Sequence, residues 1–250
     1  MPIETTREPT DRHRLVLQKE KRWRRWLYRL LPRYRFSNDL YEDLIKKQLR
    51  EGVCWVDLGC GRNEFIAELR RAGVTACGVD QQVHPDRFEN PLSPFILAHL
   101  HELPFRDQAL DLITSNMVLE HLPNPREALG EMHRVLKSGG LGIHRTPNRF
   151  HPLNLIKHLL PENLKIKLIR AVLGVSERDL FPTYYRANQL GKLRRLCRQS
   201  AFEQVKMHAL EDVHTVFGFF FLLSLVYYGI VWLFGLRFLR GIFVAVVRRT

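Results

Sequence analysis

The chain has 250 residues, of which 45% are hydrophobic and 26% charged, and its formal net charge is +13. This length can bury one good-sized α/β core or two small domains, and the ordinary apolar content argues against a disordered chain. The four cysteines show neither Cys-x-x-Cys spacing nor the spacing of metal ligands. We therefore predict no metal site and interpret the cysteines as reduced packing residues.

The basic residues are concentrated in the two flanks of the chain. Residues 1–50 carry 14 Lys and Arg against 7 Asp and Glu, whereas residues 51–164 carry 11 against 14. Residues 165–250 carry 14 against 5. Basic flanks around a slightly acidic middle fit attraction to an anionic membrane surface at least as well as binding to nucleic acid.

Residues 15–31 have the period of an amphipathic helix. Its apolar face holds Trp23, Trp26, Leu27, Leu30 and Leu31, its other face is rich in Lys and Arg, and Pro32 ends it. Tryptophan and leucine opposite arginine are typical of a helix in a membrane interface. Packing of this helix on the rest of the protein is the equal alternative. We define residues 1–50 as a basic amphipathic N-terminal segment.

Short apolar runs alternate with helical patterns from residue 51 onward. We predict strands over 53–58, 74–79, 95–98, 110–114 and from 141, with helices over 64–71 and 125–136. A basic helix over 189–198 and a strand over 202–207 follow. This alternation predicts an α/β fold with a doubly wound parallel sheet, in a domain spanning 51–210. Within that domain, 149–200 is predicted to form a helical insertion on the substrate side.

Residues 216–236 contain no charged side chain. This apolar run is long enough to cross the hydrocarbon core of a bilayer. A buried helix is the weaker alternative, because little chain remains to surround it. The arginines that follow would place the C-terminus in the cytoplasm, and a single span would then move the preceding domain outside. We therefore favour a monotopic or re-entrant anchor, broken at Gly229 and Gly235, within a hydrophobic membrane-associating tail of residues 214–250. The run 241–247 is too short to span alone. The catalytic domain is expected in the cytoplasm.

The strongest chemical signal follows the first predicted strand. This strand delivers Asp57 and then Gly59-Cys60-Gly61 into a helix. Glycines allow a sharp turn and bring backbone N–H groups close to a ligand at a helix N-terminus, although dinucleotide sites use similar parts. Asp80 ends the second strand, where a carboxylate can accept hydrogen bonds from both hydroxyls of a ribose.

Several motifs occur in a characteristic order over residues 53–148. They are VDLGCG (56–61), GVD (78–80), LPFRDQALDLI (103–113) and SNMVLEHLPNPREALGEMHRVLKSGG (115–140). In this order the chain resembles the class I S-adenosyl-L-methionine (SAM)-dependent methyltransferases, specifically the type 11 group of small-molecule and lipid-precursor methylases. The resemblance implies a Rossmann-like methyltransferase sheet with SAM as cofactor.

The resemblance also implies roles for individual residues. Gly59, Cys60 and Gly61 would pass the amino acid part of SAM, with Asp57 organising the loop, and Asp80 would hold the ribose. Gln81, His99 and Leu100 would border the adenine, and Asn116 and Met117 would line the floor near the methionine carboxylate and sulfonium. Two positions depart from the family pattern: Asn63 replaces the third glycine, and His99 replaces an aspartate that accepts from the adenine amino group. Asparagine tolerates the left-handed backbone conformation, and a neutral imidazole can accept a hydrogen bond.

Methyl transfer from a sulfonium depends mostly on positioning and on the exclusion of water. A base is needed only if the acceptor must lose a proton. His121, after the fourth strand, is our candidate for that catalytic role, and a packing or capping histidine is the alternative.

We therefore expect methyl transfer to a small amphipathic or lipid-linked acceptor at a membrane. A nucleic-acid methyltransferase is the competing enzymatic hypothesis, favoured only by charge. The run Ser115-Asn116-Met117-Val118 differs from the Asn/Asp-Pro-Pro-aromatic run typical of base-amino methylases, so nucleic acid is the less favoured acceptor. A non-catalytic SAM-binding protein is the third possibility.

Overall fold

The computed structural model describes residues 24–83, 94–159, 181–212 and 218–250. In these residues a seven-stranded sheet has the order β3-β2-β1-β4-β5-β7-β6. The strands are β1 (Cys54–Leu58), β2 (Thr75–Asp80), β3 (Phe95–Leu97), β4 (Leu110–Asn116), β5 (Leu136–Pro147), β6 (Gln204–Leu210) and β7 (Ile242–Arg248). The first six agree with the strands expected from the sequence, with shifted ends.

The direction of the strands defines a functional edge of the sheet. β1 to β5 pair in parallel, and β7 is antiparallel to both β5 and β6, so β6 runs in the same direction as β1 to β5. All strands except β7 therefore end at one edge, which we call the carboxyl edge. Ligands of open α/β sheets bind at this edge. The predicted doubly wound Rossmann-like architecture is confirmed.

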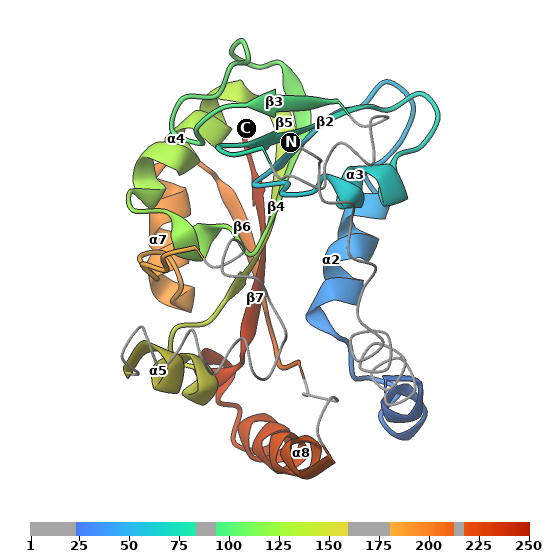
Figure 1. Ribbon diagram of the computed structural model, residues 1–250, viewed down its shortest axis with the longest axis vertical. Helices are drawn as coiled ribbons and strands as arrows, with labels where there is room; N and C mark the ends of the chain where they lie inside the picture. Colours follow the sequence, from blue (N-terminus) through green and yellow to red (C-terminus); the bar gives the residue numbers. More distant parts are fainter. Residues whose placement is uncertain (1–23, 84–93, 160–180, 213–217) are drawn as a thin grey trace, which may run out of the picture.

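Helices cover both faces of the sheet and its carboxyl edge (Figure 1). One face carries α2 (Ser37–Lys46) and α3 (Glu64–Leu69), and the other carries α4 (Pro125–Val135) and α7 (Leu190–Gln199). The helices α5 (Pro152–Leu159) and α8 (Gly218–Leu233), with the short turns η2 (Leu119–His121) and η4 (Arg237–Leu239), lie toward the carboxyl edge. The helix α7 packs on α4 and so covers one face of the sheet. The prediction that residues 149–200 form an insertion on the substrate side is therefore wrong for α7.

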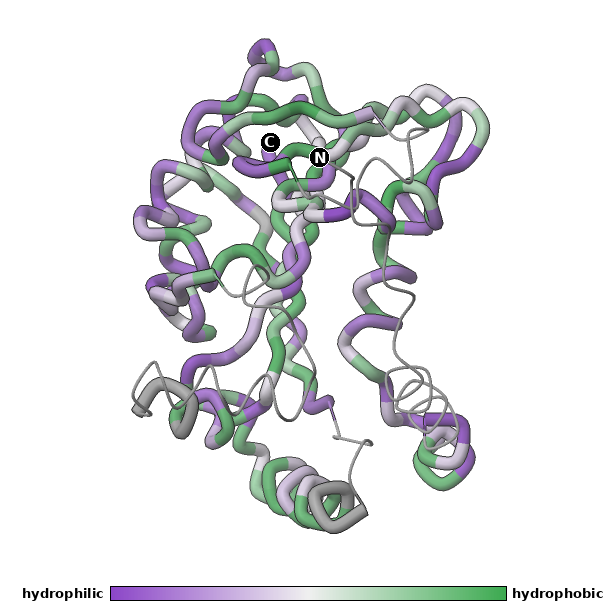
Figure 2. The backbone as a smooth tube through the Cα atoms, viewed as in Figure 1, coloured by the Kyte–Doolittle hydropathy of each residue, from purple (hydrophilic) through white to green (hydrophobic). Residues whose placement is uncertain are grey.

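Two apolar clusters hold these layers together. Successive residues of a strand point to opposite faces, so Trp55 packs with Tyr41 and Ile45 of α2, whereas Val56 packs with Leu129 of α4. Strands buried on both faces read as continuous apolar runs, which is why the central strands could be predicted. Figure 2 shows this hydrophobic interior along the strands.

The C-terminal strand corrects the predicted boundary of the domain. Residues 242–248 pair with both β5 and β6, and Phe243, Val244 and Ala245 are fully buried. The prediction of a membrane-associating tail is therefore wrong for these residues, because most of their apolar side chains are packed in the clusters on the two faces of the sheet. Arg249 lies at the opposite edge from α8, where its Nη1 donates to the carbonyls of His133, Arg134 and Leu136.

The apolar segment before β7 forms α8, a helix of 16 residues. Gly229 lies inside this helix, whereas Gly235 follows it with a φ of 64°. In the part of the chain that the structure describes, no helix combines the length and apolar character needed to cross a membrane.

The predicted N-terminal helix is described only over residues 24–30; residues 15–23 lie outside the described residues. Leu27 is fully buried with Tyr34 and Phe36, and Leu225 and Tyr228 of α8 pack against this cluster. The helix therefore packs on the protein through Leu27. Trp26 and Leu30 remain 42% and 55% exposed.

Candidate functional site

The glycine loop after β1 is anchored to the end of β2. The N–H groups of Gly59 and Cys60 donate to Val79 O at 2.7 and 3.2 Å, and Gly61 N–H donates to Asp80 Oδ2 at 2.9 Å. Gly59 has a φ of +66°, and a Cβ there would lie 2.5 Å from Val118 Cγ2, so only glycine fits. Gly61 has a φ of +51°, and a Cβ there would meet no atom within 4 Å. The loop thus leaves space for a ligand beside Gly61.

Asn63, at the irregular end of the loop, adopts the conformation that glycine would supply. Its φ is 62°, its side chain is buried, and its Nδ2 donates to Pro94 O at 3.1 Å. Gly78 of β2 lies underneath, where a Cβ would come within 2.5 Å of Cys60 Sγ. The side chain of Cys60 therefore packs toward β2, and Gly78, the first residue of the GVD motif, has a packing role that was not predicted.

Asp57 braces two strands beneath the loop. Its Oδ1 accepts a hydrogen bond from Thr114 Oγ1 at 2.6 Å, and Thr114 in turn accepts from Trp55 Nε1 at 2.8 Å. Burial raises the pKa of Asp57 to about 7, with the charge of Asp80 adding to the shift and the Thr114 hydrogen bond opposing it. Asp57 thus joins β1 to β4 directly under the glycine loop.

Asp80 is held as an acceptor at the end of β2. Besides Gly61, its carboxylate accepts from Gln82 N–H at 3.2 Å. Each carboxylate oxygen has two lone-pair positions, so both can accept a further hydrogen bond from a ribose hydroxyl. Gln81 is exposed beside it, and Leu97, which pairs with Asp80 in the sheet, is 59% exposed. An exposed apolar side chain next to this carboxylate suits the adenine ring.

The residues expected to border the adenine edge differ in what they offer. His99 is exposed, and its ring stacks on His101 with 5.2 Å between centroids. Leu100 packs its side chain against the core, so it can border a ligand mainly through its backbone.

The end of β4 carries the predicted floor. Met117 has a φ of 56°, a conformation that L-residues with side chains rarely adopt and that often marks functional sites. Its N–H donates to Arg145 O at 2.8 Å, and Arg145 Nη1 donates to Asn116 Oδ1 at 2.9 Å. Arg145 was not predicted from the motifs. The available signal was a charged residue near the carboxyl end of the predicted fifth strand.

His121 lies beside a buried carboxyl group. Its Nδ1 is 2.8 Å from Pro182 O, and because a carbonyl only accepts, Nδ1 carries the proton. His121 Nε2 is 4.0 Å from Glu120 Oε1. Glu120 Oε2 accepts from Thr146 Oγ1 at 3.0 Å, and burial raises the pKa of Glu120 to about 7. The hydrogen bond to Pro182 thus orients the imidazole of His121 and leaves Nε2 as its basic atom.

A second buried pair joins the segments at the carboxyl edge. His151 Nε2 and Glu211 Oε1 are 3.0 Å apart, and Gly241 N–H donates to Glu211 Oε2 at 2.8 Å. This pair ties the start of α5 to both ends of the segment that contains α8. Among the described residues, no three His, Cys, Asp or Glu side chains are arranged to hold a metal ion.

The fold and these residues agree with the comparisons to known proteins. The sequence profile of a family described as a methyltransferase domain matches residues 16–204, which is most of the chain. The chain therefore belongs to the class I SAM-dependent methyltransferases, and S-adenosyl-L-methionine is its cofactor. The strand order, the glycine loop and Asp80 fit this cofactor.

Individual relatives match only part of their length. An uncharacterized methyltransferase of Mycobacterium leprae is 38% identical over 97 residues, 37% of this chain and 36% of that protein. Malonyl-[acyl-carrier protein] O-methyltransferase of Hamiltonella defensa is 31% identical over 96 residues, 37% of each chain. This chain thus aligns with little more than a third of these curated relatives.

One solved structure matches almost the whole fold. It is a SAM-dependent methyltransferase of Thermotoga maritima, described as a possible histamine N-methyltransferase. The TM-score is 0.58 at 18% identity, over 95% of this chain and 97% of that one. At this identity the likeness shows the fold alone.

Proposed function

We propose that this protein transfers a methyl group from SAM to a small amphipathic or lipid-linked acceptor at an anionic membrane surface. The observation that carries the proposal is the position of α8. Ile242 of β7 pairs with Leu210 of β6 and with Pro147 of β5, so the segment 211–241 leaves and rejoins the sheet at the carboxyl edge. The apolar helix therefore shares this edge with the loops that we propose to bind SAM.

The helix α8 has one packed face and one exposed face. Leu225, Tyr228 and Val231 turn toward the protein. Large apolar side chains cover the other side and continue past the helix end; they are Leu222, Leu223, Val226, Ile230, Trp232, Leu233, Phe234 and Phe238, each at least 47% exposed. The helix α8 contains no charged residue. An apolar patch of this kind marks a surface that contacts lipid or another apolar partner.

Exposed basic side chains accompany this apolar surface. On the neighbouring N-terminal helix Arg25, Arg29, Trp26 and Leu30 are all exposed, and Arg237 follows α8. Arginine beside tryptophan and leucine is typical of helices that lie in the headgroup region of anionic bilayers. A nucleic-acid surface would instead be mainly basic and polar, which makes that acceptor class the less favoured alternative.

Catalysis requires that the acceptor be held in line with the methyl group. When bound, SAM supplies an electrophilic methyl group on a sulfonium. Asp80 would hold its ribose, the loop Gly59–Gly61 would pass its amino acid part, and Asn116 with Met117 would form the floor. If the acceptor is a hydroxyl or an amine, His121 Nε2 would take the proton that the nucleophile loses, and the nearby Glu120 carboxylate would stabilise the imidazolium that forms.

The experiment is the transfer of labelled methyl groups from SAM into a membrane lipid extract, compared with a water-soluble metabolite extract. We expect label in an organic-soluble product whose identity mass spectrometry then gives. The variant Asp80→Ala should lose this transfer, and Glu42→Gln, a change in the Glu42–Lys46 ion pair of α2, should retain it. Label confined to the aqueous fraction or to nucleic acid would overturn the proposed acceptor class. Binding of SAM without transfer to any fraction would favour a non-catalytic SAM-binding protein.

A further inference from the structure

Arg145 contacts three separate parts of the protein at the carboxyl edge. Its Nη1 donates to Asn116 Oδ1 at 2.9 Å, on the predicted cofactor floor. Its Nε donates to Ser37 Oγ at 2.7 Å, at the start of α2. Its Nη2 lies 3.2 Å from Asp212 Oδ2, just after β6. One guanidinium thus joins the floor to two segments that lead outward from the sheet.

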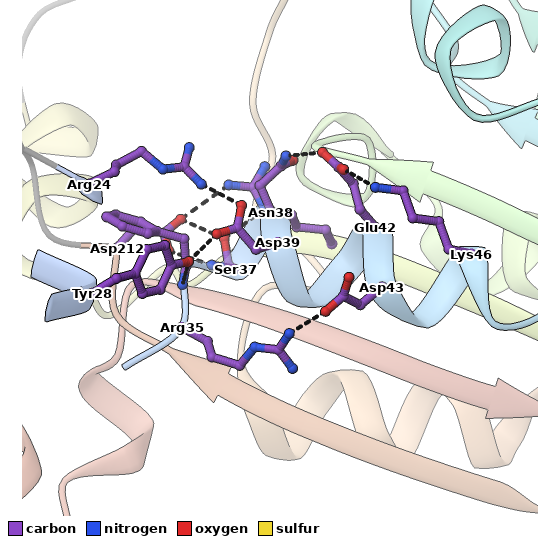
Figure 3. Close-up of polar contacts among 12 residues, drawn as sticks. Arg24, Tyr28, Arg35, Ser37, Asn38, Asp39, Glu42, Asp43, Lys46 and Asp212 are labelled. Carbon is purple, nitrogen blue, oxygen red and sulfur yellow. Dashed lines mark hydrogen bonds and ion pairs between the residues drawn. The ribbon is translucent and has the colours of Figure 1, made fainter. Parts of the chain in front are cut away.

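Ser37 and Asp212 also bond to each other. Ser37 N–H donates to Asp212 Oδ1 at 2.7 Å, and Ser37 Oγ donates to Asp212 Oδ2 at 2.5 Å (Figure 3). Ser37 is fully buried, and the side chains of Arg145 and Asp212 are only 13% and 24% exposed. Charge-assisted hydrogen bonds in such surroundings are strong and geometrically specific.

The two outward segments form one unit, which we call the cap and define as residues 24–36 together with 218–239. The rings of Tyr34 and Tyr228 meet at 5.2 Å, in the apolar cluster around Leu27. The cap is also bonded to α2, since Arg24 and Tyr28 both donate to Asp39 (Figure 3). Any displacement of the cap is therefore expected to disturb the start of α2, where Ser37 lies.

We propose that Arg145 is a positioning residue through which the cap and the cofactor floor stabilise each other. If the cap moves away, Ser37 and Asp212 leave the guanidinium, and a mostly buried cation loses two of its acceptors. The same arginine orients Asn116, and its own carbonyl holds the backbone of Met117. Coupling of this kind is reciprocal, so SAM binding orders the cap, and an ordered cap tightens SAM binding. This inference rests on the placement of SAM at the ends of β1, β2 and β4 proposed above.

The variant Asp212→Asn tests the coupling, because it keeps the side-chain size but removes the charge that faces Arg145. The matched control is Glu42→Gln, which removes a charge from the ion pair with Lys46, a pair that lies wholly within α2 and outside the cap. SAM affinity is measured by calorimetry, and hydrogen exchange of the cap is followed with and without S-adenosylhomocysteine. In the unaltered protein we expect the ligand to slow exchange in residues 24–36 and 222–239. Asp212→Asn should weaken SAM binding by between about 5-fold and 150-fold, the usual range of such coupling, and abolish the slowing. Glu42→Gln should change neither.

Two further measurements keep the outcomes distinct. If Asp212→Asn fails to fold, Ser37→Ala removes the shared hydroxyl instead and should give the same two losses. Rescue by Asp212→Glu, which restores the charge, would support a positioning role. Equal SAM affinity and equal cap protection in Asp212→Asn and Glu42→Gln would overturn the coupling. If the unaltered protein does not bind SAM, the cofactor placement itself fails, and the coupling fails with it.

Discussion

The exposed face of α8 gives a quantitative prediction for lipid binding. Leu222, Val226 and Leu233 are 62%, 60% and 71% exposed, together equivalent to about two fully exposed apolar side chains. Full burial of one such side chain is worth roughly 1.5–3 kcal/mol. Their transfer into a membrane interface would then contribute roughly 3–6 kcal/mol to the free energy of binding. Since about 1.4 kcal/mol corresponds to a tenfold change in affinity, replacing all three residues by glutamine should weaken vesicle binding at least about a hundredfold.

Co-sedimentation with vesicles of mixed phosphatidylcholine and phosphatidylglycerol measures this loss. The control is Leu97→Gln, which removes a leucine of similar exposure, 59%, at the end of β3. The control should bind vesicles like the unaltered protein, and both variants should keep its thermal stability because the replaced side chains are exposed. Unchanged vesicle binding of the triple variant, or an equal loss in Leu97→Gln, would refute the assignment of α8 to the lipid surface.

Three further predictions concern stability and catalysis. Burial raises the pKa of Asp57 from 3.8 to about 7, so its contribution to the free energy of unfolding is complete below about pH 4 and is lost as pH rises through 7, by at most about 4 kcal/mol. Denaturant unfolding of the apo protein should show this decline, and Asp57→Asn should make it shallower. An identical pH profile for the variant and the unaltered protein would contradict the prediction. Gly59→Ala should destabilise the fold more than Gly52→Ala in the same unfolding assay, since both positions have positive φ but only at Gly59 would a Cβ clash with Val118. The left-handed conformation costs roughly 1–2 kcal/mol at either site, and overpacking adds roughly 1–3 kcal/mol at Gly59. Equal losses of stability in the two variants would rule out the contact between position 59 and Val118. Burial raises the pKa of Glu120 to about 7, and Arg145, His121 and Tyr185 lie near its carboxyl group. For a hydroxyl or amine acceptor, turnover should therefore rise with pH through about 7 as Glu120 becomes anionic. Glu120→Gln should remove this inflection and His121→Asn should lower turnover at every pH, whereas an unchanged pH profile in Glu120→Gln would exclude the proposed role of Glu120.

Local patterns were sufficient to predict the central strands and the position of the glycine loop. A strand buried on both faces is a short apolar run, and a glycine pair after such a run marks a sharp turn, so Gly59, Gly61 and Asp80 could be located from neighbouring residues alone. The same local pattern misled us at residues 242–248, because an apolar run after α8 has the composition of both a membrane-associating tail and a central strand. Only pairing with β5 and β6 distinguishes the two.

The contacts that organise the carboxyl edge could not be predicted from spacing. Arg145 is separated by 108 residues from Ser37 and by 67 from Asp212. The tautomer of His121 depends on the carbonyl of Pro182, 61 residues away. No periodicity links such positions, since the fold alone brings them together.

The central claim, that the ends of β1, β2 and β4 bind SAM, is tested most directly by calorimetric titration of the protein with SAM. We predict saturable binding that Asp80→Ala weakens by about tenfold or more, because a hydrogen bond to a charged group is worth roughly 1.5–3 kcal/mol. The control variant Glu42→Gln should bind SAM like the unaltered protein. No binding at millimolar SAM, or equal affinity in Asp80→Ala, would contradict the claim.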